Sequence, residues 1–253
     1  IYTGEDTLSL HDALPIYVVL HAATDYGRSA QLPTSVYAAN VEFPMRLLEL
    51  AMSSSIRLFA NIDTFFNTKN KEYEHLGEYT LSKRHFQEWG EICGKKGTLR
   101  FVNLRLFHLY GPGDSGEKFM PSIIDKCLND SQIDLTDGLQ RRDFIYIDDA
   151  VRAINSGIEA EISKSSGYVH YDVGSGTSHS IREVVESIKR LSNSNSVLNF
   201  GALPNRVGEF VDACADVRAL NKISWSPQTS LEEGLRRTIG SQRYRGCFGE
   251  KLC

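Results

Sequence analysis

The chain has 253 residues, of which 41% are hydrophobic and 24% charged, and its net charge is −4. This is the composition of a globular protein with room for one large domain or two smaller ones. The mild acidity argues against a nucleic-acid binder, which needs a concentrated basic surface. No apolar run reaches the ~18 residues that span a membrane, so no membrane partner is expected. Five cysteines without CxxC spacing indicate a reducing, cytoplasmic location.

The first half of the chain alternates between buried strands and amphipathic helices. The pattern predicts strands over 17–23, 56–62 and 99–107, and helices over 34–54 and 75–96. Such a βαβαβ order is typical of a parallel sheet with right-handed crossovers. The predicted fold class is therefore α/β.

A turn cluster at 110–114 separates this part from a second set of elements. A capping box, Ser180 with Glu183, predicts a helix start, and Ser230 with Glu233 predicts another. The remaining elements expected here are a helix over 118–129, a strand followed by a helix within 141–158, and a strand at 168–174.

The pair Tyr79 and Lys83, in "YTLSK", lies one helical turn apart on one face of the predicted helix. An ammonium beside a phenol lowers the pKa of the phenol, and such a tyrosine can move a hydroxyl proton during hydride transfer. The spacing also arises by chance in a chain with 11 tyrosines, so the pair alone does not establish a site.

Four other positions allow two interpretations each. Thr64 follows a predicted parallel strand, where open α/β sheets bind ligands, but it also suits a turn cap. His108 either lines a pocket or is structural. Arg142, beside Asp143, either forms an ion pair or offers a guanidinium to a phosphate, and the same two readings apply to Arg206 with Glu209.

The order of these motifs is more specific than any one of them. "VVLHAA", Asn40, the strand-end Thr64, YxxxK, "LRLFHLYGPGD", "RRDFIYIDDAV", "YDVGSG" and "NRVGEF" follow one another along the chain. This series resembles the extended short-chain dehydrogenase/reductase family, which includes the NAD-dependent epimerases and dehydratases of nucleotide sugars. The resemblance covers about residues 17–240.

The resemblance implies a role for each motif. Tyr79 would be the acid/base, Lys83 would hold the nicotinamide ribose, and Thr64 would complete a catalytic triad. Asn40 would brace the site. An NAD or NADP cofactor would lie along the residues at the end of the first predicted strand and the residue that ends the third. A nucleotide-sugar substrate would bind to the segments that contain Arg142 and Arg206. The cofactor set is His21, Ala22, Ala23, Asn40, Tyr79, Lys83 and Phe107, and the substrate set is His108, Arg142, Arg206 and Glu209.

The resemblance also implies a Rossmann-type, doubly wound parallel sheet with a smaller C-terminal substrate domain. The cofactor domain would span 17–112, and residues 113–240 would form mainly the substrate domain, with strands around 143–147 and 168–174 returning to the sheet. Dimers paired through the helices that contain Asn40 and Tyr79 are implied for the full-length protein.

Two departures narrow the activity. Family dehydratases carry an Asp-Glu pair after the threonine, but Phe65 and Phe66 follow Thr64 here, which disfavours dehydration. The chain looks most similar to the nucleotide-sugar 4-ketoreductases of deoxysugar biosynthesis, such as CDP-abequose synthases. Epimerisation uses the same residues and stays open, as does a non-catalytic, NAD(P)-sensing relative.

The family's opening strands and its GxxGxxG loop do not occur in the sequence. In their place stands "IYTGEDTLSLHDALPI", residues 1–16, which resembles translated sequencing-adapter DNA. We therefore expect 1–16 to be an extraneous leader, the Rossmann sheet to be incomplete, and this chain by itself to bind cofactor poorly and be inactive. Residues 241–253 have no assignment.

Overall fold

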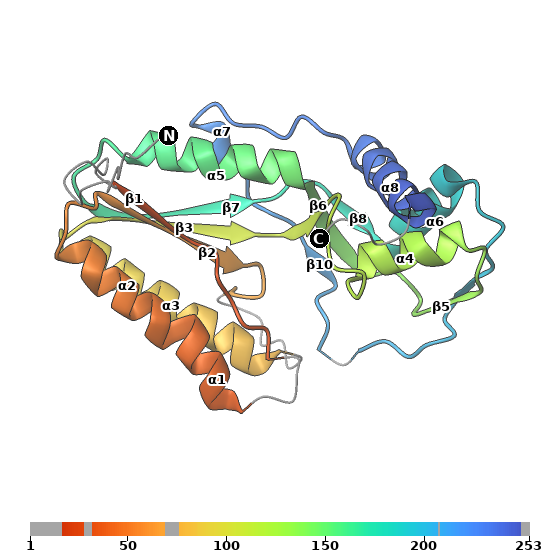
Figure 1. The fold of residues 1–253 in the computed structure, drawn as a ribbon, viewed down its shortest axis with the longest axis horizontal. Coiled ribbons are helices and arrows are strands. Elements are labelled where there is room, and N and C mark those ends of the chain that lie inside the picture. The colour runs from red at the N-terminus through yellow and green to blue at the C-terminus, as the bar shows by residue number, and fades with distance from the viewer. Residues whose placement is uncertain (1–16, 28–31, 69–75, 207, 249–253) are drawn as a thin grey trace, which may run out of the picture.

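The computed structural model describes residues 17–27, 32–68, 76–206 and 208–248. Its main sheet has four parallel strands in the order β1-β2-β3-β7 (Figure 1). These are β1 (Val18–His21), β2 (Leu58–Thr64), β3 (Arg100–Leu106) and β7 (Gly167–Val173). The predicted α/β class and the first three strands are confirmed.

Helices cover both faces of the main sheet, which makes a three-layer lobe (Figure 1). One face packs α2 (Phe43–Met52) and α3 (Gly77–Lys95) over buried aromatic side chains such as Phe59 and Phe101. The other face packs α5 (Ile147–Glu161) and the short α7 (Arg218–Asn221). Because both faces are buried, apolar residues predominate in the strands, and the polar residues are mainly in their carboxyl-terminal halves.

The helical segment after β1 is not one regular helix. α1 (Pro33–Tyr37) passes into a π-helical turn, η1 (Ala38–Glu42), and then into α2. The π turn contains Asn40, which is buried. Single π turns within α-helices are frequent at functional sites, and the sequence pattern showed only the helix around this one.

α3 lies close against the sheet because of a glycine. A Cβ atom added at Gly90 would lie 2.0 Å from the ring of Phe101 on β3. Only glycine permits this approach, which holds the part of α3 that carries Tyr79 and Lys83 next to the ends of the strands.

The remaining elements form a smaller lobe with its own core. Its helices α4 (Phe119–Leu128), α6 (Ile181–Ser192) and α8 (Leu231–Phe248) enclose buried residues such as Ile124, Ile188 and Leu235. The strands of this lobe are β4 (His108–Tyr110), β5 (Ile133–Leu135), β6 (Arg141–Tyr146), β8 (Ser178–Ser180), β9 (Leu198–Phe200) and β10 (Asp212–Ala213).

The pairing of β6 corrects one expectation. The segment 168–174 does return to the main sheet as β7, but 143–147 does not: β6 pairs with β4, β8 and β10 in a second sheet. The physical reason is that the chain turns out of the main sheet directly after β3, so that β4 begins only two residues later in the second sheet. β6 pairs with β4 there.

The two capping predictions differ in outcome. Ser180 and Glu183 form the full reciprocal box at the start of α6. At α8 the Glu233 amide donates to the Ser230 hydroxyl at 3.2 Å. The helix then runs to Phe248, so part of the unassigned 241–253 segment is helical. The expected leader, 1–16, lies outside the described residues.

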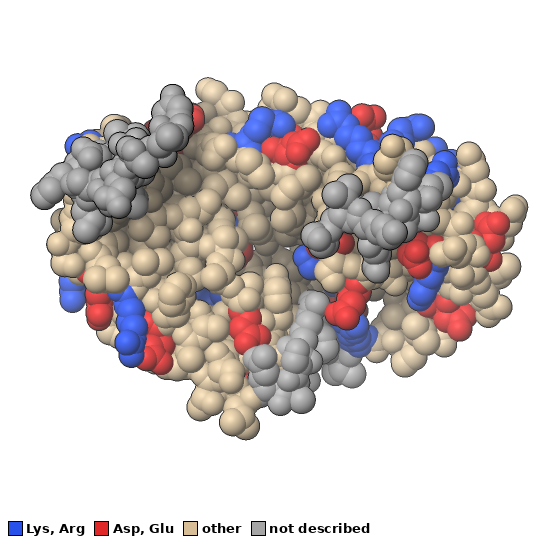
Figure 2. Space-filling view, viewed as in Figure 1, with Lys and Arg blue, Asp and Glu red and all other residues tan. Residues whose placement is uncertain are grey.

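Basic and acidic side chains lie next to one another over the face shown in Figure 2. Ion pairs among the described residues include Arg236 with Glu232 at 2.6 Å and Arg190 with Glu232 at 3.1 Å. Within the described ranges, none of the helices has the length and apolar character needed to cross a bilayer.

Candidate active site

Thr64, Tyr79 and Lys83 come together at the carboxyl end of β2. Thr64 is the last residue of that strand, and Tyr79 and Lys83 are one turn apart on α3. All three are buried. Thr64 lies close enough to Tyr79 to lower the pKa of the phenol, and the Lys83 ammonium donates to the carbonyl of Ile62 on β2 at 2.6 Å. The structure thus brings the three candidate catalytic residues together at one end of the sheet.

The pKa of Tyr79 differs from the sequence-based expectation. Burial raises this pKa, as do Tyr26 and Asp63, while hydrogen bonds with Thr64 and Thr24 lower it, and the net direction is upward. Desolvation disfavours the phenolate more than the local donors favour it. The expected lowering by Lys83 is therefore not seen, and the buried tyrosine is a protonated acid.

Burial also lowers the pKa of Lys83, while the Asp63 carboxylate raises it. Desolvation disfavours a buried ammonium, and a nearby carboxylate opposes that effect. The charge state of Lys83 therefore depends on Asp63, a residue that the sequence patterns did not single out.

Asn40 connects three parts of the site. Its Oδ1 accepts from the Asp25 amide at 2.8 Å and from Thr24 at 3.2 Å, and its Nδ2 donates to the Asp25 carbonyl at 2.7 Å and to Ser82 at 3.0 Å. The π turn thereby fixes the loop after β1 against α3, next to Lys83.

The residues after β1 divide into two groups. The His21 side chain is 3% exposed and lies among the rings of Phe43, Phe59 and Phe86. Burial, with Lys83 nearby, lowers the pKa of His21 to about 4. His21 is thus an uncharged core residue, and only its backbone can meet a ligand. Ala22 and Ala23, by contrast, are exposed at the end of the strand.

An aromatic cluster extends from Tyr79 toward the smaller lobe. Phe66 lies edge-on to Tyr79 with ring centroids 6.5 Å apart, and Phe65 lies 4.2 Å from the ring of His108. The buried rings of Phe65, Phe107 and Phe210 pack together. Phe107 therefore belongs to this apolar wall.

His108 presents an unpaired polar atom at this wall. Its Nδ1 is buried and has no hydrogen-bond partner among the described residues. Burial, with Arg142 nearby, lowers the pKa of His108 to about 3, so the imidazole is neutral. A neutral imidazole with an unpaired nitrogen can donate to or accept from a sugar hydroxyl.

The two arginine segments differ in exposure. Arg142 is buried, pairs with Glu209 at 2.8 Å and donates to the Phe210 carbonyl at 2.7 Å. Arg206 is exposed on the loop before Glu209. The structure records no contact between Arg206 and the other candidate residues in the described ranges.

Sequence reasoning missed Thr24, Tyr26 and Asp63. The Tyr26 ring lies 4.9 Å from that of Tyr79, and Thr24 contacts both Tyr79 and Asn40. Thr24 and Tyr26 follow a buried strand, and Asp63 stands directly before Thr64. A carboxylate within a strand buried on both faces is the signal that could have identified Asp63.

This geometry defines a class of protein. A buried tyrosine and lysine one turn apart on a helix, with a hydroxyl at the end of a parallel strand, have the functional groups that proton transfer during hydride transfer requires. The NAD dependent epimerase/dehydratase family matches residues 4–174, and the chain belongs to this family. The expected family and enzyme class are thereby confirmed.

Among curated proteins, the chain is 36% identical to the CDP-abequose synthase of Salmonella muenchen, over 90% of this chain and 77% of that protein. It is 35% identical to the CDP-abequose synthase of Salmonella typhimurium strain LT2, over 92% of this chain and 78% of that protein. Among solved structures, the UDP-glucose 4-epimerase of Thermotoga maritima shares the fold with a TM-score of 0.78 at 20% identity, covering 90% of this chain and 77% of that one.

Proposed function

We propose that this protein is a nucleotide-sugar 4-ketoreductase of deoxyhexose biosynthesis, with Tyr79 as its acid/base. The observation that carries the proposal is the burial of Thr64, Tyr79 and Lys83 together at the end of β2, with Tyr79 and Lys83 one turn apart on α3. Similarity to two CDP-abequose synthases over some 90% of the chain supports a CDP-activated sugar.

The donors of the site suit a nicotinamide nucleotide. An ammonium has three N–H donors, and Lys83 uses one on the Ile62 carbonyl. The other donors, with the Tyr79 hydroxyl, match the paired hydroxyls of a ribose. Lys83 and Tyr79 would therefore hold NAD or NADP, along Ala22, Ala23 and Phe107, and the bound nicotinamide would supply the hydride.

The chain's own residues handle the proton. Reduction of a ketone adds a hydride to carbon and a proton to oxygen. Tyr79, kept protonated by its buried position, donates that proton to the sugar oxygen, while the Thr64 hydroxyl hydrogen-bonds the same oxygen. In the reverse direction Tyr79 takes the proton back. Lys83 stabilises the phenolate that Tyr79 becomes.

The side chains around Tyr79 favour a reduced, deoxygenated sugar. Phe65 and Phe66 stand where dehydration would need acids, and their rings form an apolar wall at the site. His108 would bind a sugar hydroxyl through its unpaired Nδ1. Arg206 and Arg142, the latter oriented by Glu209, would bind the diphosphate of a substrate held mainly by residues 113–240.

The experiment is to incubate the protein, expressed from its complete gene, with CDP-abequose and either NAD⁺ or NADP⁺. A 4-ketoreductase run in reverse produces one reduced nicotinamide for each sugar oxidised, followed by absorbance. An epimerase, the second candidate because it uses the same residues, would convert the sugar without net cofactor reduction. No turnover of this sugar or of related CDP-deoxyhexoses with either cofactor would contradict the proposal.

We further propose that the protein is a homodimer through the helices that carry Asn40 and Tyr79. These helices expose large apolar side chains that one chain leaves uncovered: Tyr37, Phe43, Leu50, Leu81, Trp89 and Ile92. Light scattering should give twice the chain mass, and Leu81→Arg should give a monomer. A wild-type monomer at micromolar concentration would contradict this arrangement.

A cytoplasmic location is proposed for the same protein. Cys93, Cys127 and Cys214 are free thiols among the described residues. Free thiols persist in reducing compartments. Fractionation of the source cells tests the location, and recovery outside the cytoplasm would contradict it.

A further inference from the structure

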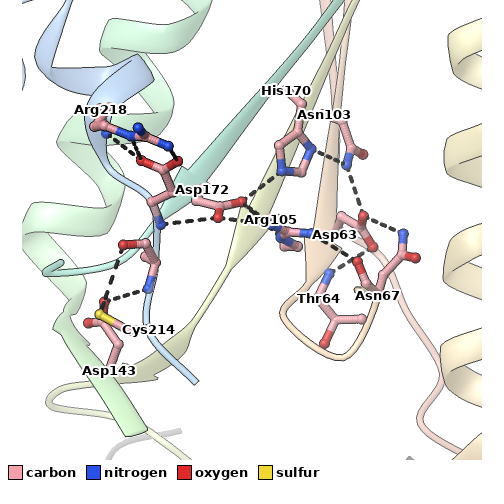
Figure 3. A network of polar contacts seen from close by, with 12 residues as sticks. Asp63, Thr64, Asn67, Asn103, Arg105, Asp143, His170, Asp172, Cys214 and Arg218 are labelled. Carbon is pink, nitrogen blue, oxygen red and sulfur yellow. Dashed lines mark hydrogen bonds and ion pairs between the residues drawn. The ribbon is translucent and has the colours of Figure 1, made fainter. Parts of the chain in front are cut away.

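The carboxyl-terminal halves of three strands are joined by a closed ring of polar contacts (Figure 3). Asp63 lies on β2, Asn103 and Arg105 on β3, and His170 and Asp172 on β7. Strand pairing places Asn61, Asn103 and His170 side by side across the sheet. Two residues further along each strand, Asp63, Arg105 and Asp172 form a second such row. The loop residue Asn67 closes the ring.

The contacts run continuously around the ring. Asn67 and Asn103 each donate to Asp63 Oδ2 at 2.8 Å. Asn103 also contacts His170 Nδ1 at 3.2 Å, and His170 Nε2 contacts Asp172 at 2.7 Å. Arg105 binds both oxygens of Asp172 at 2.8 Å and reaches the Asn67 carbonyl at 3.0 Å.

The hydrogen-bond directions fix the state of the histidine. Asn61 donates to Asn103 Oδ1 at 2.8 Å, so the other end of the Asn103 amide is the NH₂ group. That group donates both to Asp63 and to His170, and therefore His170 Nδ1 must accept. The histidine proton is on Nε2 and points to Asp172.

The ring meets the active site at Asp63. The other carboxylate oxygen of Asp63, Oδ1, accepts from the backbone amide of Thr64 at 2.8 Å. The residue on its other side, Ile62, gives its carbonyl to the Lys83 ammonium. Asp63 is 3% exposed, so its charge acts in a medium that screens it little.

We propose that Asp63 is a positioning residue of this enzyme: the polar ring holds its carboxylate in place, and the carboxylate fixes the Thr64 backbone and sets the field at Tyr79 and Lys83. This inference rests on the proposed reductase chemistry. The groups that face the pair are Tyr26 at Tyr79 and His21 at Lys83, with Asp63 acting on both. Asp63 raises the pKa of Tyr79 and of Lys83.

The decisive variant is Asp63→Asn, which removes the charge and keeps the size. Asp172→Asn is the matched control, because it makes the same change in the same ring, away from Tyr79. The readout is the pH profile of kcat for oxidation of CDP-abequose by the protein from its complete gene. Turnover in this direction needs Tyr79 as a phenolate and Lys83 as an ammonium, so the pKa values of these two groups set the two limbs of the profile. Asp63→Asn should therefore move both limbs to lower pH by about 0.5–1 unit.

Asp172→Asn, which disturbs the ring but leaves the Asp63 charge in place, should lower the melting temperature and move the limbs less than Asp63→Asn does. The proposal would be overturned if the pH profile of Asp63→Asn coincided with that of the wild type. It would also be overturned if the limbs of that profile moved no further than those of Asp172→Asn. If Tyr79→Phe keeps full turnover, the reductase chemistry itself fails, so the two failures are distinguishable.

A second measurement needs no variant. Nitrogen-15 NMR of labelled wild-type protein reports which ring nitrogen of each histidine carries the proton. His170, assigned by comparison with His170→Gln, should show the Nε2–H tautomer near neutral pH. An Nδ1–H tautomer would mean that Asn103 does not bridge His170 and Asp63, and the ring that positions Asp63 would be refuted even if Asp63→Asn does not fold.

Discussion

The Asn40 amide nitrogen donates to the Ser82 hydroxyl at 3.0 Å, which ties the π turn between α1 and α2 to the residue before Lys83. Ser82 in turn donates to the carbonyl of Tyr79 at 2.8 Å. The helix that carries the proposed acid/base, Tyr79, is therefore held by a buried amide from another helix, as well as by its packing on the sheet.

Asn40→Ala should cost about 2–3 kcal/mol of unfolding free energy, because it leaves the Asp25 backbone groups and Ser82 without their buried partner. Urea denaturation measures the loss. Asn129→Ala is the control, since Asn129 is exposed and its amide contacts Asp125 on its own helix. Equal stabilities of the two variants would show that the Asn40 contacts do not hold the site together.

Gly90→Ala should destabilise the protein by about 2 kcal/mol, because the new methyl group would lie 2.0 Å from the Phe101 ring. Gly77→Ala is the matched control on the same helix: a Cβ there meets nothing within 4 Å. Alanine at Gly77 should leave stability unchanged or raise it by up to about 1 kcal/mol. Calorimetric melting of both variants checks the contrast, and a Gly90→Ala protein as stable as wild type would show that α3 can move off β3.

His21 makes stability depend on pH. Its pKa is about 4 in the fold and 6.5 when unperturbed, so the unfolded chain binds the extra proton between these values. Stability from this group is complete above pH 6.5 and falls as the pH drops toward 4, by about 3 kcal/mol.

His21→Phe should remove that part of the pH dependence, because the new ring fits among Phe43, Phe59 and Phe86 without titrating. Urea midpoints measured between pH 4 and 7 test this. The half-exposed His85→Phe is the control. If His21→Phe loses stability with falling pH as steeply as wild type, burial of a neutral His21 is not the cause.

The sequence was enough to find the strands of the main sheet and the neighbours Thr64, Tyr79 and Lys83, since helical spacing and strand ends are local features. It could not reveal the contact between Asp63 and His170 through Asn103. That contact depends on which residues of β2, β3 and β7 stand level, and only strand pairing fixes the register.

Local sequence patterns also gave wrong predictions where two opposing effects, or two possible pairing partners, decided the outcome. The Tyr79–Lys83 spacing predicted a lowered phenol pKa, but no lowering by Lys83 is seen and burial raises the pKa. The apolar run of β6 fits either sheet, and its pairing with β4 was decided by where β3 ends.

The central claim is that Tyr79 moves the proton, and Tyr79→Phe tests it most directly against Tyr37→Phe, a control at an exposed tyrosine. Turnover of CDP-abequose and binding of cofactor should both be measured. We predict that Tyr79→Phe lowers kcat by roughly 10²–10⁴-fold while the dissociation constants for sugar and cofactor change little, and that Tyr37→Phe behaves as wild type. A Tyr79→Phe enzyme that keeps wild-type kcat would contradict the account.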